Sequence, residues 1–89
     1  MSNRLFMVEV IIENKPEARD PEGDTILNSL ILKGGYKQVR SVRAAKYLRL
    51  TVEADSGAKA ENLVKKMCDE LRIYNPAAHI CKVRLESSN

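Results

Sequence analysis

The sequence predicts an α+β domain whose strands and helices follow one another in the order β-α-β-β-α-β. Four segments read as strands, two carry the apolar stripe of an amphipathic helix, and no repeat or linker divides the 89 residues. The simplest packing of that order is a ferredoxin-like sandwich. It has a four-stranded antiparallel sheet, both helices on one face, and the first and third strands at the centre.

The first strand, Leu5–Glu13, is apolar on both faces. Either face could turn toward the helices, and both would leave apolar residues on the opposite side; one arrangement has Phe6, Val8, Val10 and Ile12 facing the helices. In that arrangement the opposite face carries apolar residues of the first strand that no helix covers: Leu5, Met7 and Ile11. Tyr47 and Thr51 of the third strand lie on the same face. Because an exposed apolar patch is a liability for so small a chain, we expect a second sheet to cover it, in a homodimer or a dimer of dimers.

The first helix is expected over Pro21–Lys33, with both ends marked in the sequence. Asp20 can cap its free N–H groups, Pro21 suits the first helical position, and Gly34 can take the left-handed conformation that ends it. Its apolar face comprises Ile26, Leu27, Leu30 and Ile31.

The second strand, Tyr36–Arg43, is the least regular element. Its apolar members Val39 and Val42 are three residues apart, which suggests a bulge or a sheet edge. The remaining elements are a cleanly alternating third strand, a helix with a continuous apolar stripe and a last strand, at Lys46–Ala54, Ala60–Leu71 and Ile80–Glu86.

Composition indicates one cytoplasmic domain spanning residues 1–89. The 15 basic and 12 acidic residues nearly balance, so the net charge of +3 does not imply nucleic acid. No apolar run approaches the roughly 20 residues that span a bilayer, and the N-terminus does not resemble a signal peptide. Cys68 and Cys81 lack a Cys-x-x-Cys spacing, so we interpret them as buried free thiols in a reducing compartment.

The sequence offers no catalytic constellation and no metal site. His79 is the only histidine; a thiolate–imidazole pair with Cys81 is an alternative to a buried thiol. Asp20, Glu22 and Asp24 are spaced like the start of a calcium loop, but Ile31 stands where such a loop needs an acid. Helix capping explains the first two of these acids without a metal.

A basic cluster is the main functional candidate: Arg40, Arg43, Lys46 and Arg49. It indicates either a solvated strand surface or a docking site for an acidic protein surface or a phosphate-bearing ligand. The alternative function is a stand-alone ferredoxin-like module that binds RNA or a small anion. However, Tyr47 alone would be a weak platform for stacking bases. An acyl phosphatase is not indicated either, because the residues after the first strand do not form the glycine-rich, arginine-bearing loop that such an enzyme needs.

Several short motifs, in order, resemble the PurS family, the small subunit of phosphoribosylformylglycinamidine synthase. They are Asp20-Pro21-Glu22-Gly23-x-Thr25-Ile26, Gly35-Tyr36-x-x-Val39, Val42-Arg43-x-x-Lys46-Tyr47-x-x-Leu50-x-Val52-Glu53 and Met67-Cys68-x-x-Leu71. The chain departs from the family pattern at Ala45, where glycine is usual, and by one extra residue before Asn75-Pro76.

The resemblance implies a non-catalytic subunit of an ATP-dependent carbon–nitrogen ligase in de novo purine biosynthesis. The complex converts formylglycinamide ribonucleotide, ATP and glutamine into formylglycinamidine ribonucleotide, ADP, phosphate and glutamate, using ATP and Mg²⁺, with no cofactor bound by this chain. The implied partners are the large synthase subunit PurL and the glutaminase PurQ, which must dock closely for ammonia to pass between them. The implied docking residues are Arg40, Arg43, Lys46 and Tyr47, and the implied structural residues are Asp20, Pro21, Gly23, Thr25, Gly35 and Tyr36.

Overall fold

The computed structural model describes residues 4–86, so the first three residues, part of the N-terminus considered above, lie outside the described range. The elements in order are β1 (Arg4–Asn14), α1 (Pro21–Thr25), η1 (Ile26–Ile31), β2 (Ala45–Ala54), α2 (Gly57–Glu70) and β3 (His79–Leu85). η1 continues α1 with wider, π-helical turns, in which the Leu32 N–H donates to the Leu27 carbonyl at 2.9 Å.

The sheet has three strands, in the antiparallel order β2-β1-β3. Val8 lies opposite Leu50 of β2 and Leu85 of β3, so one face of β1 receives apolar residues from both neighbours. The prediction of a four-stranded sheet is therefore wrong. The first strand is central as expected, but the predicted third strand, now β2, lies at an edge.

The missing strand is the segment predicted at Tyr36–Arg43, which has no regular structure. With Val39 and Val42 three residues apart, the segment offers no alternating apolar face to a sheet. It is held against the start of α1 instead. Val42 passes so close to Gly23 that a side-chain carbon there would come within 2.2 Å of the Val42 carbonyl oxygen, and the Ala44 N–H donates to the Asp20 carboxylate.

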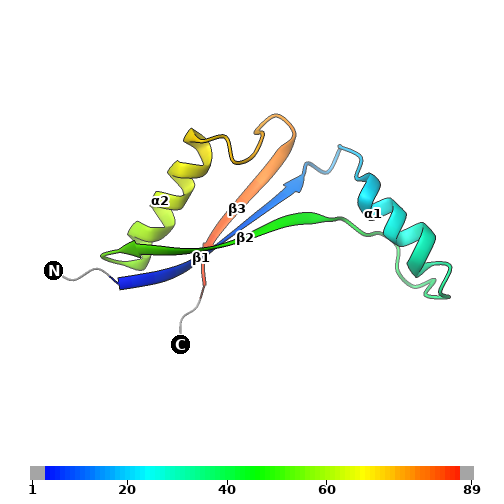
Figure 1. Cartoon of the computed structure of the whole chain (residues 1–89). Coiled ribbons are helices and arrows are strands. Elements are labelled where there is room, and N and C mark those ends of the chain that lie inside the picture. The colour runs from blue at the N-terminus through cyan, green and yellow to red at the C-terminus, as the bar shows by residue number, and fades with distance from the viewer. Residues whose placement is uncertain (1–3, 87–89) are drawn as a thin grey trace.

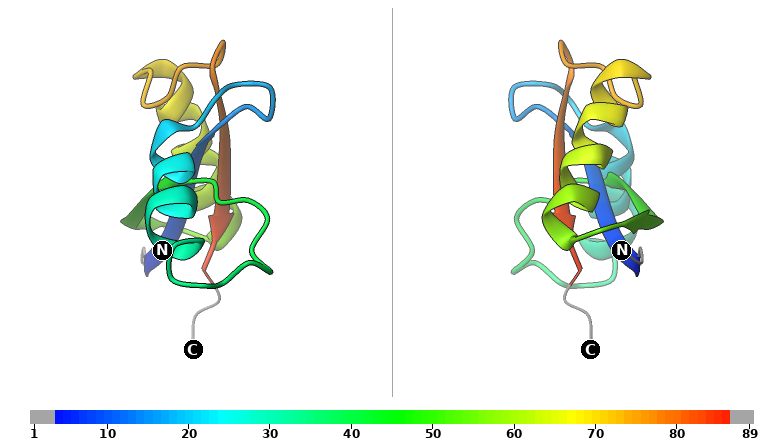
Figure 2. Two further views of the ribbon diagram at one scale, coloured as in Figure 1. Left: turned by 90° about the vertical axis from the view of Figure 1, so that its right-hand side faces the viewer. Right: turned by 90° about the vertical axis from the view of Figure 1, so that its left-hand side faces the viewer.

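The first helix stands clear of the sheet. Within residues 4–86, α1 and η1 contact each other but none of the strands and not α2. Figures 1 and 2 show them at one end of an elongated molecule, with α2 at the other. The radius of gyration is 16.9 Å, against about 12 Å for a compact chain of this length. The prediction that both helices cover one face is thus wrong for the first helix.

The core lies between the sheet and α2 alone. Buried side chains of α2 pack on buried side chains of β1 and β2, a set that comprises Ala60, Val64, Cys68, Val8, Val10, Ile12 and Val52. Ser56 caps α2, since its hydroxyl accepts from the Lys59 N–H at 3.2 Å. The predicted stripe is confirmed at its centre, whereas Leu63 and Leu71 at its margins are more than half exposed.

Helix α2 ends on a residue in the left-handed conformation, Arg72, with φ of 54°. The Ile73 N–H then donates back to the Cys68 carbonyl at 3.1 Å, which satisfies a carbonyl of the last helical turn. Glycine usually occupies such a position, because a side chain there costs free energy.

Candidate functional site

The entrance to α1 is built around Asp20, whose side chain is buried, with the residue only 5% exposed. Its carboxylate accepts the Gly23 N–H at 3.2 Å and the Ala44 N–H at 2.6 Å. These bonds, that from Ala44 foremost, lower the pKa of Asp20. The predicted cap is confirmed. In addition, the same carboxylate ties the start of the helix to the start of β2.

Arg43 holds the loop between β1 and α1. Its guanidinium donates to the carbonyls of Ala18 at 3.0 Å, Lys15 at 2.9 Å and Asn14 at 3.3 Å. Three backbone oxygens thus receive a charged donor from a residue that is distant in sequence. This contact gives Arg43 a structural role that its place in a basic cluster did not reveal.

The predicted docking residues do not form one edge. Arg40 lies exposed in the irregular segment. Lys46 pairs with Ile12 on the side of α2, while Tyr47 pairs with Ile11 and points to the opposite side, because neighbouring strand residues alternate. Whether any of them contacts a partner stays a prediction.

The other predicted motif residues cluster at the two ends of the first helix. Pro21 is its first residue and Thr25 ends α1, where its side chain is exposed. Gly35 has φ of +95°, the left-handed conformation expected after a helix, and Tyr36 next to it is 65% exposed. The left-handed residue after the helix is therefore Gly35 and not Gly34, the residue predicted from the sequence.

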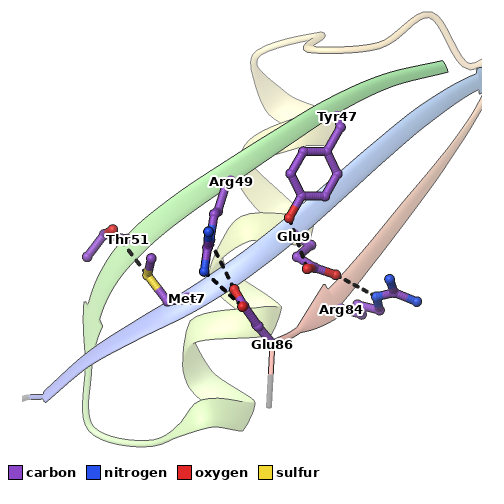
Figure 3. Close-up of polar contacts among 7 residues, drawn as sticks. All are labelled: Met7, Glu9, Tyr47, Arg49, Thr51, Arg84 and Glu86. Carbon is purple, nitrogen blue, oxygen red and sulfur yellow. Dashed lines mark hydrogen bonds and ion pairs between the residues drawn. The ribbon is translucent and has the colours of Figure 1, made fainter. Parts of the chain in front are cut away.

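The sheet face turned away from α2, here called the open face, carries a network of charges (Figure 3). Glu9 accepts the Tyr47 hydroxyl at 2.9 Å and the Arg84 Nε–H at 2.6 Å. Arg49 holds Glu86 with two hydrogen bonds, at 3.1 and 2.8 Å. The bond from Arg84, followed by that from Tyr47, lowers the pKa of Glu9, and Glu9 in turn raises the pKa of Tyr47.

Sequence reasoning missed this network. Tyr47 lies on the uncovered face as predicted, but which charged side chains it meets depends on strand register. Apolar residues lie beside the charges as expected: Leu5 is 69% exposed, and Met7 and Ile11 are partly exposed. Since the acidic and basic side chains of the open face already pair with one another, a partner surface that buried this face would leave few charges without a counter-ion.

A concave region of about 440 Å³ lies on the α2 side of the sheet, between the start of α1 and the start of β3. Its lining mixes Asp20, Glu22 and Lys46 with His79, whose Nδ1 accepts the Asn75 N–H at 3.1 Å. The described residues contain no group of three or more histidine, cysteine or acidic side chains able to hold a metal ion. No helix formed by residues 4–86 is long and apolar enough to cross a membrane.

These features define a small binding domain. Its two exposed surfaces, the open face and the first helix, are suited to partners. Tyr47, the aromatic residue that RNA stacking would use, donates to Glu9 within a network of carboxylates. The alternative of an RNA-binding module is thereby not favoured.

Comparison with known proteins identifies the family. The family described as "PurS: Phosphoribosylformylglycinamidine (FGAM) synthase" matches residues 7–87. A curated relative, the PurS subunit of phosphoribosylformylglycinamidine synthase from Thermotoga maritima, is 36% identical over 80 residues, covering 90% of this chain and 95% of the relative. The chain belongs to the PurS family, whose members are subunits of FGAM synthase in purine biosynthesis.

Solved structures agree with the fold. The crystal structure of the Thermotoga maritima PurS subunit superimposes with a TM-score of 0.85 at 34% identity, covering 97% of each chain. A PurS-like chain in the structure of PurLQS from Thermotoga maritima gives 0.82 at 35% identity, covering 93% of this chain and 99% of that one. The resemblance seen in the sequence motifs is confirmed, and so is the three-stranded architecture in place of the four-stranded one.

Proposed function

We propose that this chain is the non-catalytic subunit that joins the large synthase subunit PurL to the glutaminase PurQ in FGAM synthase. The observation that carries the proposal is the open face of the sheet, which α2 does not cover and on which Leu5 is 69% and Tyr47 51% exposed. Family membership and the likeness to a chain of a PurLQS structure support the choice of partners. In this role the chain contributes surfaces, and the ATP, Mg²⁺ and glutamine chemistry belongs to the partner subunits.

Close docking has a chemical purpose in such a complex. Ammonia released by a glutaminase becomes protonated in bulk water and then no longer acts as a nucleophile, so it must travel between active sites inside protein. A subunit that aligns the two enzymes can raise glutamine-dependent turnover without touching the substrate. We place this assembly in the cytoplasm, which the two free thiols support.

A second copy of the chain is the occupant that we propose for the first helix. α1 and η1 together span residues 21–31, and isolated helices shorter than about 12–15 residues are marginal in water. None of the residues of η1 is buried, and Leu30 is 65% exposed. An apolar helix of this length needs a partner to persist, and the same need arises in every copy of the chain.

The self-association is tested with Leu30→Glu, which places a charge on the exposed helix face. The matched control is Leu63→Glu on α2, where the leucine is 52% exposed. Light scattering coupled to gel filtration should show a dimer or larger particle for the wild type and the control, and a smaller particle for Leu30→Glu. A wild-type chain that remains monomeric at tens of micromolar would contradict self-association. If the chain were monomeric and Leu30→Glu abolished its binding to PurL, the first helix would be a contact with PurL instead.

The complex itself is tested by co-purification of the chain with PurL and PurQ in the presence of glutamine and ADP. We expect all three chains in one particle, and no PurL–PurQ particle when this chain is omitted. A stable PurL–PurQ particle that excludes the chain would refute the proposed role, whatever the outcome of the self-association test.

A further inference from the structure

The two cysteines, far apart in sequence, meet in the fold. Cys68 lies in the last turns of α2 and Cys81 near the start of β3, where it pairs with Ile12 and so points to the α2 side. Cys68 is only 1% exposed and Cys81 is half-buried against the same core. The two side chains line the same small cavity. Among residues 4–86 no hydrogen bond joins Cys81 to His79, whose Nδ1 accepts the Asn75 N–H at 3.1 Å.

A small opening leads to this pair. A cavity of about 200 Å³ is lined by both cysteines and by Lys65, Asp69 and Tyr74. The Tyr74 hydroxyl donates to Asp69 at 2.8 Å, so the loop after α2 is fixed at the rim of the cavity. The cavity can admit a molecule as small as a peroxide, and Cys81 is the more accessible of the two sulfurs.

We propose that Cys68 and Cys81 form a redox-sensitive dithiol that a hydroperoxide converts into a disulfide between α2 and β3. In the first step the Cys81 thiolate attacks one peroxide oxygen, the O–O bond breaks, and a sulfenic acid and hydroxide result. In the second step the Cys68 sulfur attacks the Cys81 sulfur, the S–S bond forms and water leaves. With hydrogen peroxide as the oxidant, the hydroxide takes up the proton that the Cys81 thiol lost, so the two thiols are oxidised to a disulfide and the peroxide is reduced to two water molecules.

The environment makes this reaction slow at neutral pH. Burial raises the pKa of Cys68 to about 11 and also raises the pKa of Cys81, so few thiolates are present. Asp69 adds to the shift of both thiols, while Lys65 and Tyr74 are the other titratable groups that line the cavity. The pair therefore stays reduced under ordinary conditions and responds to sustained oxidant.

The disulfide would have a structural consequence. It would close the short loop from Cys68 to Cys81, which contains Ile73 and His79, and both of these line the larger cavity near the start of α1. Oxidation would therefore stiffen one wall of that cavity. The inference does not depend on the proposed partners.

The test treats the full-length chain with hydrogen peroxide at mildly alkaline pH, followed by thiol counting and non-reducing peptide mapping. We expect one intramolecular Cys68–Cys81 peptide, reversed by dithiothreitol, and a Tm higher by roughly 10 °C or more. In Cys81→Ala, Cys68 should remain a free thiol; in Cys68→Ala, Cys81 should advance to sulfinic or sulfonic acid, because no resolving thiol is present.

The wild-type map decides the matter even if a variant does not fold. A wild-type chain in which Cys81 is over-oxidised while Cys68 remains a free thiol would overturn the proposal. So would a disulfide that joins two chains instead of closing within one.

Discussion

Substitution of Gly23 by alanine tests the contact that holds the irregular segment after the first helix. The added carbon would stand 2.2 Å from the Val42 carbonyl oxygen and 2.9 Å from its carbonyl carbon, both of them backbone atoms that cannot rotate away. Such overpacking costs about 1–3 kcal/mol, whereas replacing a helical glycine by alanine returns up to ~1 kcal/mol. We therefore expect Gly23→Ala to unfold with a free energy about 1–2 kcal/mol lower, and a Tm lower by roughly 4–16 °C.

Gly57→Ala is the matched control, since Gly57 also lies in the first turn of a helix. A carbon there would meet the Cδ2 of Leu85 at 2.5 Å, but this is the end of a flexible side chain that can turn aside. The control should be close to wild type in urea denaturation and thermal melting, run at one fixed protein concentration because self-association shifts apparent stability. Equal stability of Gly23→Ala and wild type would show that Val42 does not lie against Gly23.

Three further predictions concern single residues. Arg43→Ala should release the loop that its guanidinium holds, so that hydrogen–deuterium exchange of residues 15–19 is faster by about tenfold, while Arg40→Ala leaves the loop unchanged. Arg72→Gly should raise the free energy of unfolding by about 1 kcal/mol, because glycine adopts the left-handed conformation without strain; a loss of stability in urea would contradict this. Because the pKa of Asp20 is lower in the folded chain than its ordinary value of 3.8, the ionised carboxylate stabilises the fold at pH values above 3.8, and this stability is lost as the pH falls through the folded pKa. Asp20→Asn should therefore weaken the fall in the free energy of unfolding between neutral and acid pH, and an unchanged fall would refute the role.

The sequence was most informative where one periodicity had one physical cause. The apolar stripe of α2 could only face a core, and Ala60, Val64 and Cys68 are buried as predicted. Asp20 likewise caps the first helix as predicted, because a free N–H group needs a nearby acceptor whatever the tertiary structure. The cap of α2 by Ser56 follows the same rule but was not predicted.

Packing between elements could not be predicted in the same way. The apolar face of the first helix predicts that another surface buries this face, but the sequence does not say which one. In the structure, the sheet of the same chain does not contact the helix. The strand predicted at Tyr36–Arg43 depended on two apolar residues, Val39 and Val42, whose spacing of three does not match the alternation of a strand. Contacts set by register, such as Glu9 with Arg84 or Cys68 with Cys81, lie beyond any pattern within a single segment.

The most direct test of the central claim is the activity of reconstituted FGAM synthase with and without this chain. If the chain joins PurL to PurQ, omitting it should abolish most glutamine-dependent formation of formylglycinamidine ribonucleotide and leave the reaction driven by added ammonia intact. Glutamine-dependent activity that is the same in its absence would contradict the account.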